Sequence, residues 1–247
     1  MAKREQQDTF VSASNSYLGS LPKAQDWQPQ IAAIAQRFNR EYRGEKVNLP
    51  DEVMAMPVAQ EYASGLLQSK LASPFWQLAK PQKNQRWLDL GCGVSFMIYP
   101  WRDWDAIFYG QDISTVARDL VNSRGSQLNS KLFKGVKLAA AHELEYEPNF
   151  FDGAISTGVS CYYPIAYWAD VLSAVKKVLK PGGVFVFDIA DAEQPLAENW
   201  AILETYLDAE VFLEPMSDWK KAIAAAGGKI VKTLPGEILT LVKVQFS

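Results

Sequence analysis

The chain has 247 residues, 48% of them apolar, and a formal net charge of −3 at neutral pH. This length suits one large domain, or one domain with an appendage, and the charge excludes the basic surface of a nucleic-acid-binding protein. The presence of only two cysteines, a polar N-terminal stretch and the lack of a ~20-residue apolar run predict a cytoplasmic protein without a secretion signal or membrane span.

The first part of the chain, residues 1–80, is expected to be helical. Residues Gln28–Tyr42 carry apolar side chains at helical spacing, which predicts an amphipathic helix. Asp51 is the expected N-cap of a second helical stretch over residues 53–79. We expect this region to form a lid or cap over residues 81–247, in which predicted strands and helices alternate.

Residues 87–93, Trp-Leu-Asp-Leu-Gly-Cys-Gly, are typical of a buried strand that ends at a ligand. Asp89 is placed at the carboxyl end of this strand. Gly91 and Gly93 allow a tight turn and a close approach of the backbone to the ligand. A dinucleotide-binding loop needs a third glycine where this chain has Phe96, so we expect a ligand without a pyrophosphate.

A second acid, Asp112, ends the next predicted strand, residues 106–112, and lies 19 positions after Gly93. At about that spacing an acid accepts hydrogen bonds from the ribose of a nucleoside. The alternative is that Asp112 only caps the next helix, for which Ser114 is also a candidate. As a ribose ligand, Asp112 is expected to be exposed in an empty cleft, so that its removal changes the melting temperature little.

The remaining pattern predicts a mostly parallel sheet with right-handed crossovers. A helix ending near Leu179 is expected to stop at residues 181–183, Pro-Gly-Gly, before a strand that is buried on both faces. Near the end of the chain, a helix over residues 219–226 precedes two strands joined by a short turn, which predicts an antiparallel hairpin. The predicted strands of this part are residues 136–140, 151–157, 184–188, 229–234 and 238–246.

These features resemble the class I S-adenosylmethionine-dependent methyltransferases. The resemblance is carried by residues 88–93 (Leu-Asp-Leu-Gly-Cys-Gly), by Asp112 and by residues 179–183 (Leu-Lys-Pro-Gly-Gly). It implies an α/β fold, with a Rossmann-like sheet that is mostly parallel, a C-terminal antiparallel hairpin and additional N-terminal helices. It also implies S-adenosyl-L-methionine as the cofactor and methyl transfer as the activity.

The resemblance assigns site residues near the carboxyl ends of the first four strands. Those expected to bind the cofactor are Asp89, Gly91, Cys92, Gly93, Asp112, Ile113, Ala141, His142, Thr157 and Gly158. Asp89 is expected to orient the loop and to favour the ammonium group of the ligand. Ala141 and His142 are expected to flank the adenine. Tyr162 and Tyr163 are expected to contact the acceptor.

Each of these assignments has an ordinary alternative. His142 also suits a solvated loop, and Thr157 and Gly158 suit the end of any strand. Tyr162 suits the core equally well, and for Tyr167 and Trp168, one helical turn further on, the core is the expected place. No catalytic acid or base is assigned.

The acceptor is expected to be a small molecule, because the chain has neither a basic groove for nucleic acid nor the Asn-Pro-Pro-Tyr-like motif of amide- or adenine-methylating relatives. Residues 191–215 are the second expected part of the lid, and their aromatic side chains favour an apolar or aromatic acceptor. The single histidine and the lack of a ligand cluster predict no metal site. The protein is expected to be a monomer or a homodimer.

Two other functions remain open. Ala140 stands where relatives commonly have an acid, and Ser95 replaces a usual glycine, which suits a non-catalytic S-adenosylmethionine-binding protein of the same fold. The other alternative is an NAD-dependent oxidoreductase, against which Phe96 and the closing hairpin argue.

Overall fold

A computed structural model describes residues 26–67, 74–128 and 131–247 of the chain. These residues form a seven-stranded sheet of order β3-β2-β1-β4-β5-β7-β6, in which β7 runs antiparallel to both of its neighbours. The strands are β1 (Arg86–Leu90), β2 (Ile107–Asp112), β3 (Phe133–Leu138), β4 (Phe151–Ser156), β5 (Leu179–Ile189), β6 (Gly228–Pro235) and β7 (Thr240–Phe246).

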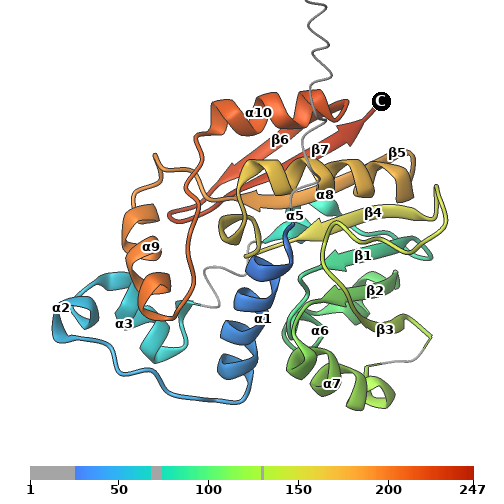
Figure 1. The fold of residues 1–247 in the computed structure, drawn as a ribbon. Helices are drawn as coiled ribbons and strands as arrows, with labels where there is room; N and C mark the ends of the chain where they lie inside the picture. Colours follow the sequence, from blue (N-terminus) through green and yellow to red (C-terminus); the bar gives the residue numbers. More distant parts are fainter. Residues whose placement is uncertain (1–25, 68–73, 129–130) are drawn as a thin grey trace, which may run out of the picture.

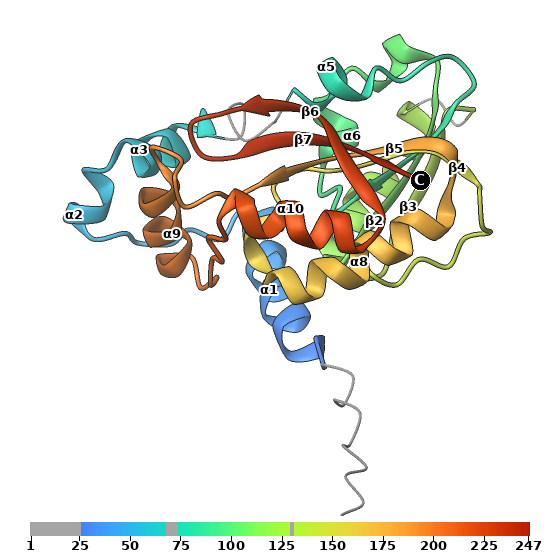
Figure 2. The same ribbon diagram turned by 90° about the horizontal axis from the view of Figure 1, so that it is seen from above.

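Helices cover both faces of the sheet and one of its ends. Figures 1 and 2 show α8 and α10 on one face and α5 on the other. Helices α2, α3 and α9 gather beyond the end of the sheet toward which β1 and β4 point (Figure 1). The helices are α1 (Gln28–Tyr42), α2 (Asp51–Met54), α3 (Pro57–Ser64), α5 (Phe75–Ala79), α6 (Ser95–Ile98), α7 (Thr115–Ser123), α8 (Ile165–Val178), α9 (Ala197–Tyr206) and α10 (Met216–Ala225).

The core consists of two apolar clusters of buried side chains. In the first, Trp168 of α8 stacks on Phe187 of β5, with ring centroids 5.3 Å apart, and Ile34 of α1 belongs to the same cluster. In the second, the aromatic rings of Trp101 and Phe108 meet at 4.1 Å. Because α1 shares a core cluster with the sheet, apolar burial holds it against the strands.

The fold class predicted from the sequence is confirmed. Helix α1 begins and ends where its apolar period predicts, and β1, β2 and β4 are parallel neighbours. The C-terminal hairpin is confirmed as well, since β6 and β7 pair antiparallel and β7 is inserted beside β5. Tyr167 and Trp168 lie in the core, as expected.

The helical stretch predicted after residue 50 is different in detail. Asp51 is not an N-cap: the N-cap position of α2 is Pro50, and Asp51 is the first helical residue. The stretch 53–79 is divided into the end of α2, α3 and α5, because turns follow Met54 and Ser64 and proline begins α3. Residues 68–73 of that prediction lie outside the described residues.

The third and fifth strands differ most from their predicted bounds. The third strand begins at Phe133 and ends at Leu138. Residues 181–183, Pro-Gly-Gly, do not form a stop between helix and strand: α8 ends at Val178 and β5 begins directly at Leu179. The glycines instead allow an irregularity within β5, because Gly182 has a φ of +80° and the register with β4 shifts there.

Among the described helices, none has both the length and the apolar character needed to cross a membrane. The division of the chain into residues 1–80 and 81–247 stays a prediction.

Candidate functional site

The loop after β1 turns back along the end of β2. The amide of Gly91 donates to the carbonyl oxygen of Gln111 at an N···O distance of 2.8 Å. Gly91 and Gly93 have φ values of +67° and +47°, which favour glycine. A Cβ on Gly91 would collide with the side chain of Val159, and a Cβ on Gly93 with the hydroxyl of Tyr42. Both conformation and space therefore require these two glycines.

Asp112, the last residue of β2, joins this loop to the helix that follows. One carboxylate oxygen accepts a hydrogen bond from the amide of Gly93 and the other from the amide of Ser114, each at 2.7 Å. Burial raises the pKa of Asp112, and the hydrogen bonds from these amides oppose that effect. A carboxylate has about four lone-pair positions, so two remain for a ligand.

The expectation that Asp112 is exposed in an empty cleft is wrong, because only 7% of its surface is accessible. Both of its carboxylate oxygens accept hydrogen bonds from backbone amides, where solvent was expected to bind. The N-cap of α7 is Ser114, whose hydroxyl accepts a hydrogen bond from the amide of Ala117 at 3.0 Å. Asp112 is therefore not the side chain that caps α7.

A cavity of about 440 Å³ adjoins the loop and Asp112. The predicted site residues that line it are Gly91, Cys92, Gly93, Asp112, Ile113, Thr157, Gly158, Tyr162 and Tyr163. The structure thus brings the ends of β1, β2 and β4 to one space, as expected for the carboxyl edge of a parallel sheet.

Asp89 does not line this cavity. Its side chain is buried, with 2% of its surface accessible, and one carboxylate oxygen accepts a hydrogen bond from the Ser95 hydroxyl at 2.6 Å. Burial raises the pKa of Asp89 to about 8, against the opposing effect of the Ser95 hydroxyl. The hydrogen bond supports a role of Asp89 in orienting the loop. Contact with a ligand ammonium group does not follow from this position.

Ala141 and His142 do not line the cavity either. The loop that contains them is held by Gln111, whose amide nitrogen donates to the carbonyl oxygens of Ala140 and Glu143 at 2.6 and 3.2 Å. Nδ1 of His142 lies 3.4 Å from the Tyr167 hydroxyl, outside the cavity wall. Their contact with an adenine stays a prediction.

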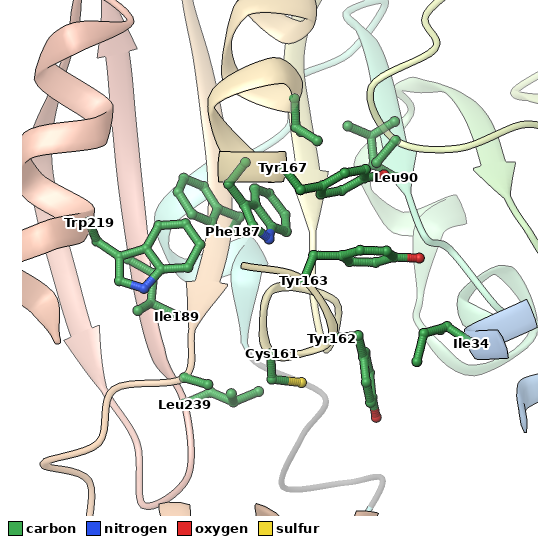
Figure 3. Close-up of a cluster of buried hydrophobic side chains, with 14 of the residues drawn as sticks. Ile34, Leu90, Cys161, Tyr162, Tyr163, Tyr167, Phe187, Ile189, Trp219 and Leu239 are labelled. Carbon is green, nitrogen blue, oxygen red and sulfur yellow. The ribbon is translucent and has the colours of Figure 1, made fainter. Parts of the chain in front are cut away.

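The turn after β4 contributes an aromatic wall. Figure 3 shows Tyr162 and Tyr163 projecting from this turn, with Ile34 of α1 on the same side. The ring of Tyr163 stacks on that of Tyr167 at 4.1 Å. Just before them, the amide of Gly158 donates to a carboxylate oxygen of Asp188 at 2.8 Å. The Tyr163 ring is thus packed against a buried ring, and the turn is attached to β5 through Asp188.

Helix α1 forms a large part of the cavity wall, through side chains that the sequence analysis did not assign to the site. Its cavity-facing residues are Ile34, Arg37, Phe38, Glu41 and Tyr42. Ile34 and Phe38 belong to the predicted apolar stripe, whereas Arg37 and Glu41 are charged residues on the same helical face. Charged residues within an apolar stripe were the sequence signal for a buried polar site, because a charge is costly to bury without a partner.

The partner of Arg37 is Glu204 of α9, 167 positions further along the chain. The Arg37 guanidinium donates from Nε and Nη2 to the two oxygens of Glu204, at 3.0 and 2.9 Å, and from Nη1 to Glu41. Tyr162 lies near Glu204, and this carboxylate adds to the effect of burial in raising the pKa of Tyr162. Burial raises the pKa of Glu204, and the nearby Arg37 opposes this. The network ties α1, α9 and the turn after β4 together around the cavity.

Within the described part of the chain, no group of three or more His, Cys, Asp or Glu side chains is arranged to hold a metal ion. The ionisable residues that line the cavity are Arg37, Glu41, Tyr42, Tyr62, Cys92, Tyr99, Asp112, Tyr162, Tyr163 and Glu204.

Comparison with known proteins identifies a domain family over part of the chain. Residues 88–187 match the family model described as a methyltransferase domain. No curated protein sequence matches the chain significantly.

Solved structures of low sequence identity share the fold. Geranyl diphosphate C-methyltransferase from Streptomyces coelicolor A3(2), in complex with Mg²⁺, geranyl diphosphate and S-adenosyl-L-homocysteine, has a TM-score of 0.65 at 14% identity, over 89% of this chain and 99% of that one. Magnesium protoporphyrin IX methyltransferase from Synechocystis PCC 6803, with bound S-adenosylmethionine, has a TM-score of 0.62 at 16% identity, over 92% and 100%.

A third such structure is 1,6-didemethyltoxoflavin-N1-methyltransferase from Burkholderia thailandensis, with a TM-score of 0.59 at 13% identity, over 91% of this chain and 92% of that one. At these identities the likeness concerns the fold alone. Residues 88–187 thus match a methyltransferase domain, and the described part of the chain has the fold of the class I S-adenosylmethionine-dependent methyltransferases.

Proposed function

We propose that the chain binds S-adenosyl-L-methionine at the loop after β1 and transfers its methyl group to a small molecule held in the adjoining cavity. The observation that carries this proposal is that Asp112 and the loop glycines face the same 440 Å³ cavity as the aromatic residues of α1 and of the turn after β4. One cavity therefore contains both the groups suited to a nucleoside and the walls suited to an acceptor.

The residues present fit the cofactor. Asp112 retains lone pairs for two ribose hydroxyls, and its contact with Gly93 holds the carboxylate beside the loop. Gly158 leaves open space at the end of β4, since a Cβ there would meet no atom within 4 Å. The space at Gly158 suits the ribose and methionine part of the ligand.

The chain's task in methyl transfer is alignment and exclusion of water. The cofactor supplies a methyl group on a positively charged sulfur. Holding an acceptor at ~3 Å in the right direction contributes about 7–11 kcal/mol to lowering the barrier. The rings of Phe38, Tyr162 and Tyr163 give the cavity a poorly hydrated wall, and aromatic faces also attract a sulfonium.

A small-molecule acceptor agrees with the proteins of similar fold. These proteins are named for geranyl diphosphate, magnesium protoporphyrin IX and 1,6-didemethyltoxoflavin. For this chain we further propose that residues 1–80 and 191–215 form the lid. The cavity-lining residues of α1, α3 and α9 support that assignment, because they line the same cavity as the strand ends.

The test is a pair of calorimetric titrations, one with S-adenosylhomocysteine and one with NAD. We expect S-adenosylhomocysteine to bind and to raise the melting temperature, because a ligand that binds only the folded state stabilises it. NAD is expected to do neither. A larger melting shift with NAD would overturn the proposal.

Catalysis is tested separately, by incubating the protein with methyl-labelled S-adenosylmethionine and a metabolite extract. We expect label to appear in a small molecule. Binding of S-adenosylhomocysteine without any labelled product would favour a non-catalytic binding protein of the same fold.

A further inference from the structure

The part of the cavity lining other than Asp112 carries more negative than positive charge. Its charged side chains are Arg37, Glu41 and Glu204, one cation and two carboxylates. Every nitrogen of the Arg37 guanidinium already donates to one of these carboxylates. An anionic ligand would therefore meet a surplus of negative charge and no free cation among them.

Tyr162 lines this space together with Glu204. The Arg37 guanidinium donates to both carboxylate oxygens of Glu204. Burial also raises the pKa of Tyr162 well above its ordinary value, which keeps the hydroxyl protonated. The oxygen of the protonated Tyr162 has lone pairs, and these can accept a hydrogen bond from the N–H or O–H of a ligand.

Aromatic rings complete the wall. Phe38 meets Tyr162 edge to face, with ring centroids 5.3 Å apart, and lies 6.0 Å from the ring of Tyr42. The Arg37 guanidinium already rests 4.3 Å from the centre of the Phe38 ring. Aromatic faces attract cations, so the rings and the carboxylate surplus favour the same kind of ligand.

We propose that the methyl acceptor is a small amine, bound with its nitrogen toward Tyr162 and Glu41; this inference rests on the proposed function. The nitrogen enters as an ammonium group and releases one proton to solvent. Its lone pair then bonds to the methyl carbon, while the carbon–sulfur bond breaks and leaves its electron pair on sulfur. The product departs as a methylated ammonium ion, so no further proton acceptor is needed.

The test compares three probes with one aromatic body and different head groups: phenethylamine, phenethyl alcohol and phenylacetate. Each is titrated by calorimetry at pH 7.5 into protein saturated with S-adenosylhomocysteine. We expect phenethylamine to bind at least tenfold more tightly than phenylacetate, with phenethyl alcohol between them. Equal or tighter binding of phenylacetate, or no binding of phenethylamine, overturns the inference.

Two variants locate the amine. Glu41→Gln is expected to weaken phenethylamine about tenfold, the effect of one charge-assisted hydrogen bond, and Tyr162→Phe about three- to tenfold. Glu45→Gln is the matched control, because Glu45 is exposed and pairs with Arg43 outside the cavity. The inference is wrong if Glu41→Gln changes the affinity no more than Glu45→Gln does.

The titration with S-adenosylhomocysteine alone keeps the two proposals separate. Absence of that binding contradicts the proposed function itself. Binding of S-adenosylhomocysteine with the wrong order of the three probes contradicts only the assignment of an amine.

Discussion

Asp89 is predicted to make the stability of the folded protein fall as the pH rises toward 8. Its carboxyl group is buried below the loop after β1, and burial raises its pKa to about 8, compared with ~3.9 for an unfolded chain. Between these two values the folded state holds a proton that the unfolded state has lost. The free energy of unfolding therefore decreases with pH in this window and levels off above pH 8.

The magnitude follows from proton linkage. One proton difference changes the free energy of unfolding by about 1.4 kcal/mol per pH unit, so the decrease from pH 5 to pH 8 reaches up to about 4 kcal/mol. Asp89→Asn keeps an oxygen that accepts from the Ser95 hydroxyl and removes the ionisable group. We expect the variant to match the wild type at pH 5 and to be the more stable protein by a few kcal/mol at pH 8.

Urea unfolding followed by tryptophan fluorescence at pH 5, 6, 7 and 8 measures this difference. Asp51→Asn serves as the control, because Asp51 is an exposed carboxylate at the start of α2. If the stabilities of Asp89→Asn and the wild type follow parallel curves over this range, Asp89 is not the titrating group and the reasoning from burial fails. An Asp89 that is neutral at pH 7 also predicts that Asp89→Asn changes the affinity for S-adenosylhomocysteine by less than about threefold.

Two further predictions concern buried polar contacts around the cavity. Asp112→Ala is expected to weaken the binding of S-adenosylhomocysteine by roughly ten- to several-hundredfold in calorimetry. The variant is also expected to lower the free energy of unfolding of the ligand-free protein by about 2 kcal/mol or more, because the amides of Gly93 and Ser114 lose their acceptor. Unchanged affinity would exclude Asp112 from the ribose site. Arg37→Met is expected to lower the free energy of unfolding, measured in urea, by about 3–5 kcal/mol, because the Glu204 carboxylate is left buried without its cation. Combining Arg37→Met with Glu204→Leu is expected to restore most of that free energy. A double variant as unstable as the single one would contradict this account.

The sequence alone predicted the parts of the fold that depend on neighbouring residues. The apolar period of residues 28–42 predicts α1 with its observed boundaries, and the short turn between two apolar runs predicts the hairpin of β6 and β7. The run from Leu88 to Gly93 likewise predicts a strand and a glycine turn. Hydrophobic periodicity and turn conformation are local properties, so a contiguous stretch of sequence is enough to determine them.

Part of the candidate site could be predicted for a related reason. In a parallel sheet the carboxyl ends of neighbouring strands meet at one edge, so the residues after β1, β2 and β4 were expected to share a space. Gly93, Asp112 and Gly158 do line one cavity. The third strand is different: the Gln111 side-chain amide donates to the carbonyl oxygen of Ala140, and the loop of Ala140 does not line that cavity.

Only the tertiary structure decided which polar groups are buried and what they contact. Arg37 and Glu204 pair across 167 positions, and nothing near either residue in the sequence indicates the other. Asp112, the last residue of β2, accepts a hydrogen bond from the amide of Gly93, whereas Asp89, the last but one residue of β1, accepts one from the Ser95 hydroxyl. Two acids near the ends of neighbouring strands therefore have different surroundings. Desolvation depends on which distant segments cover a side chain, and therefore the charge states and partners of this site emerge only when the chain is folded.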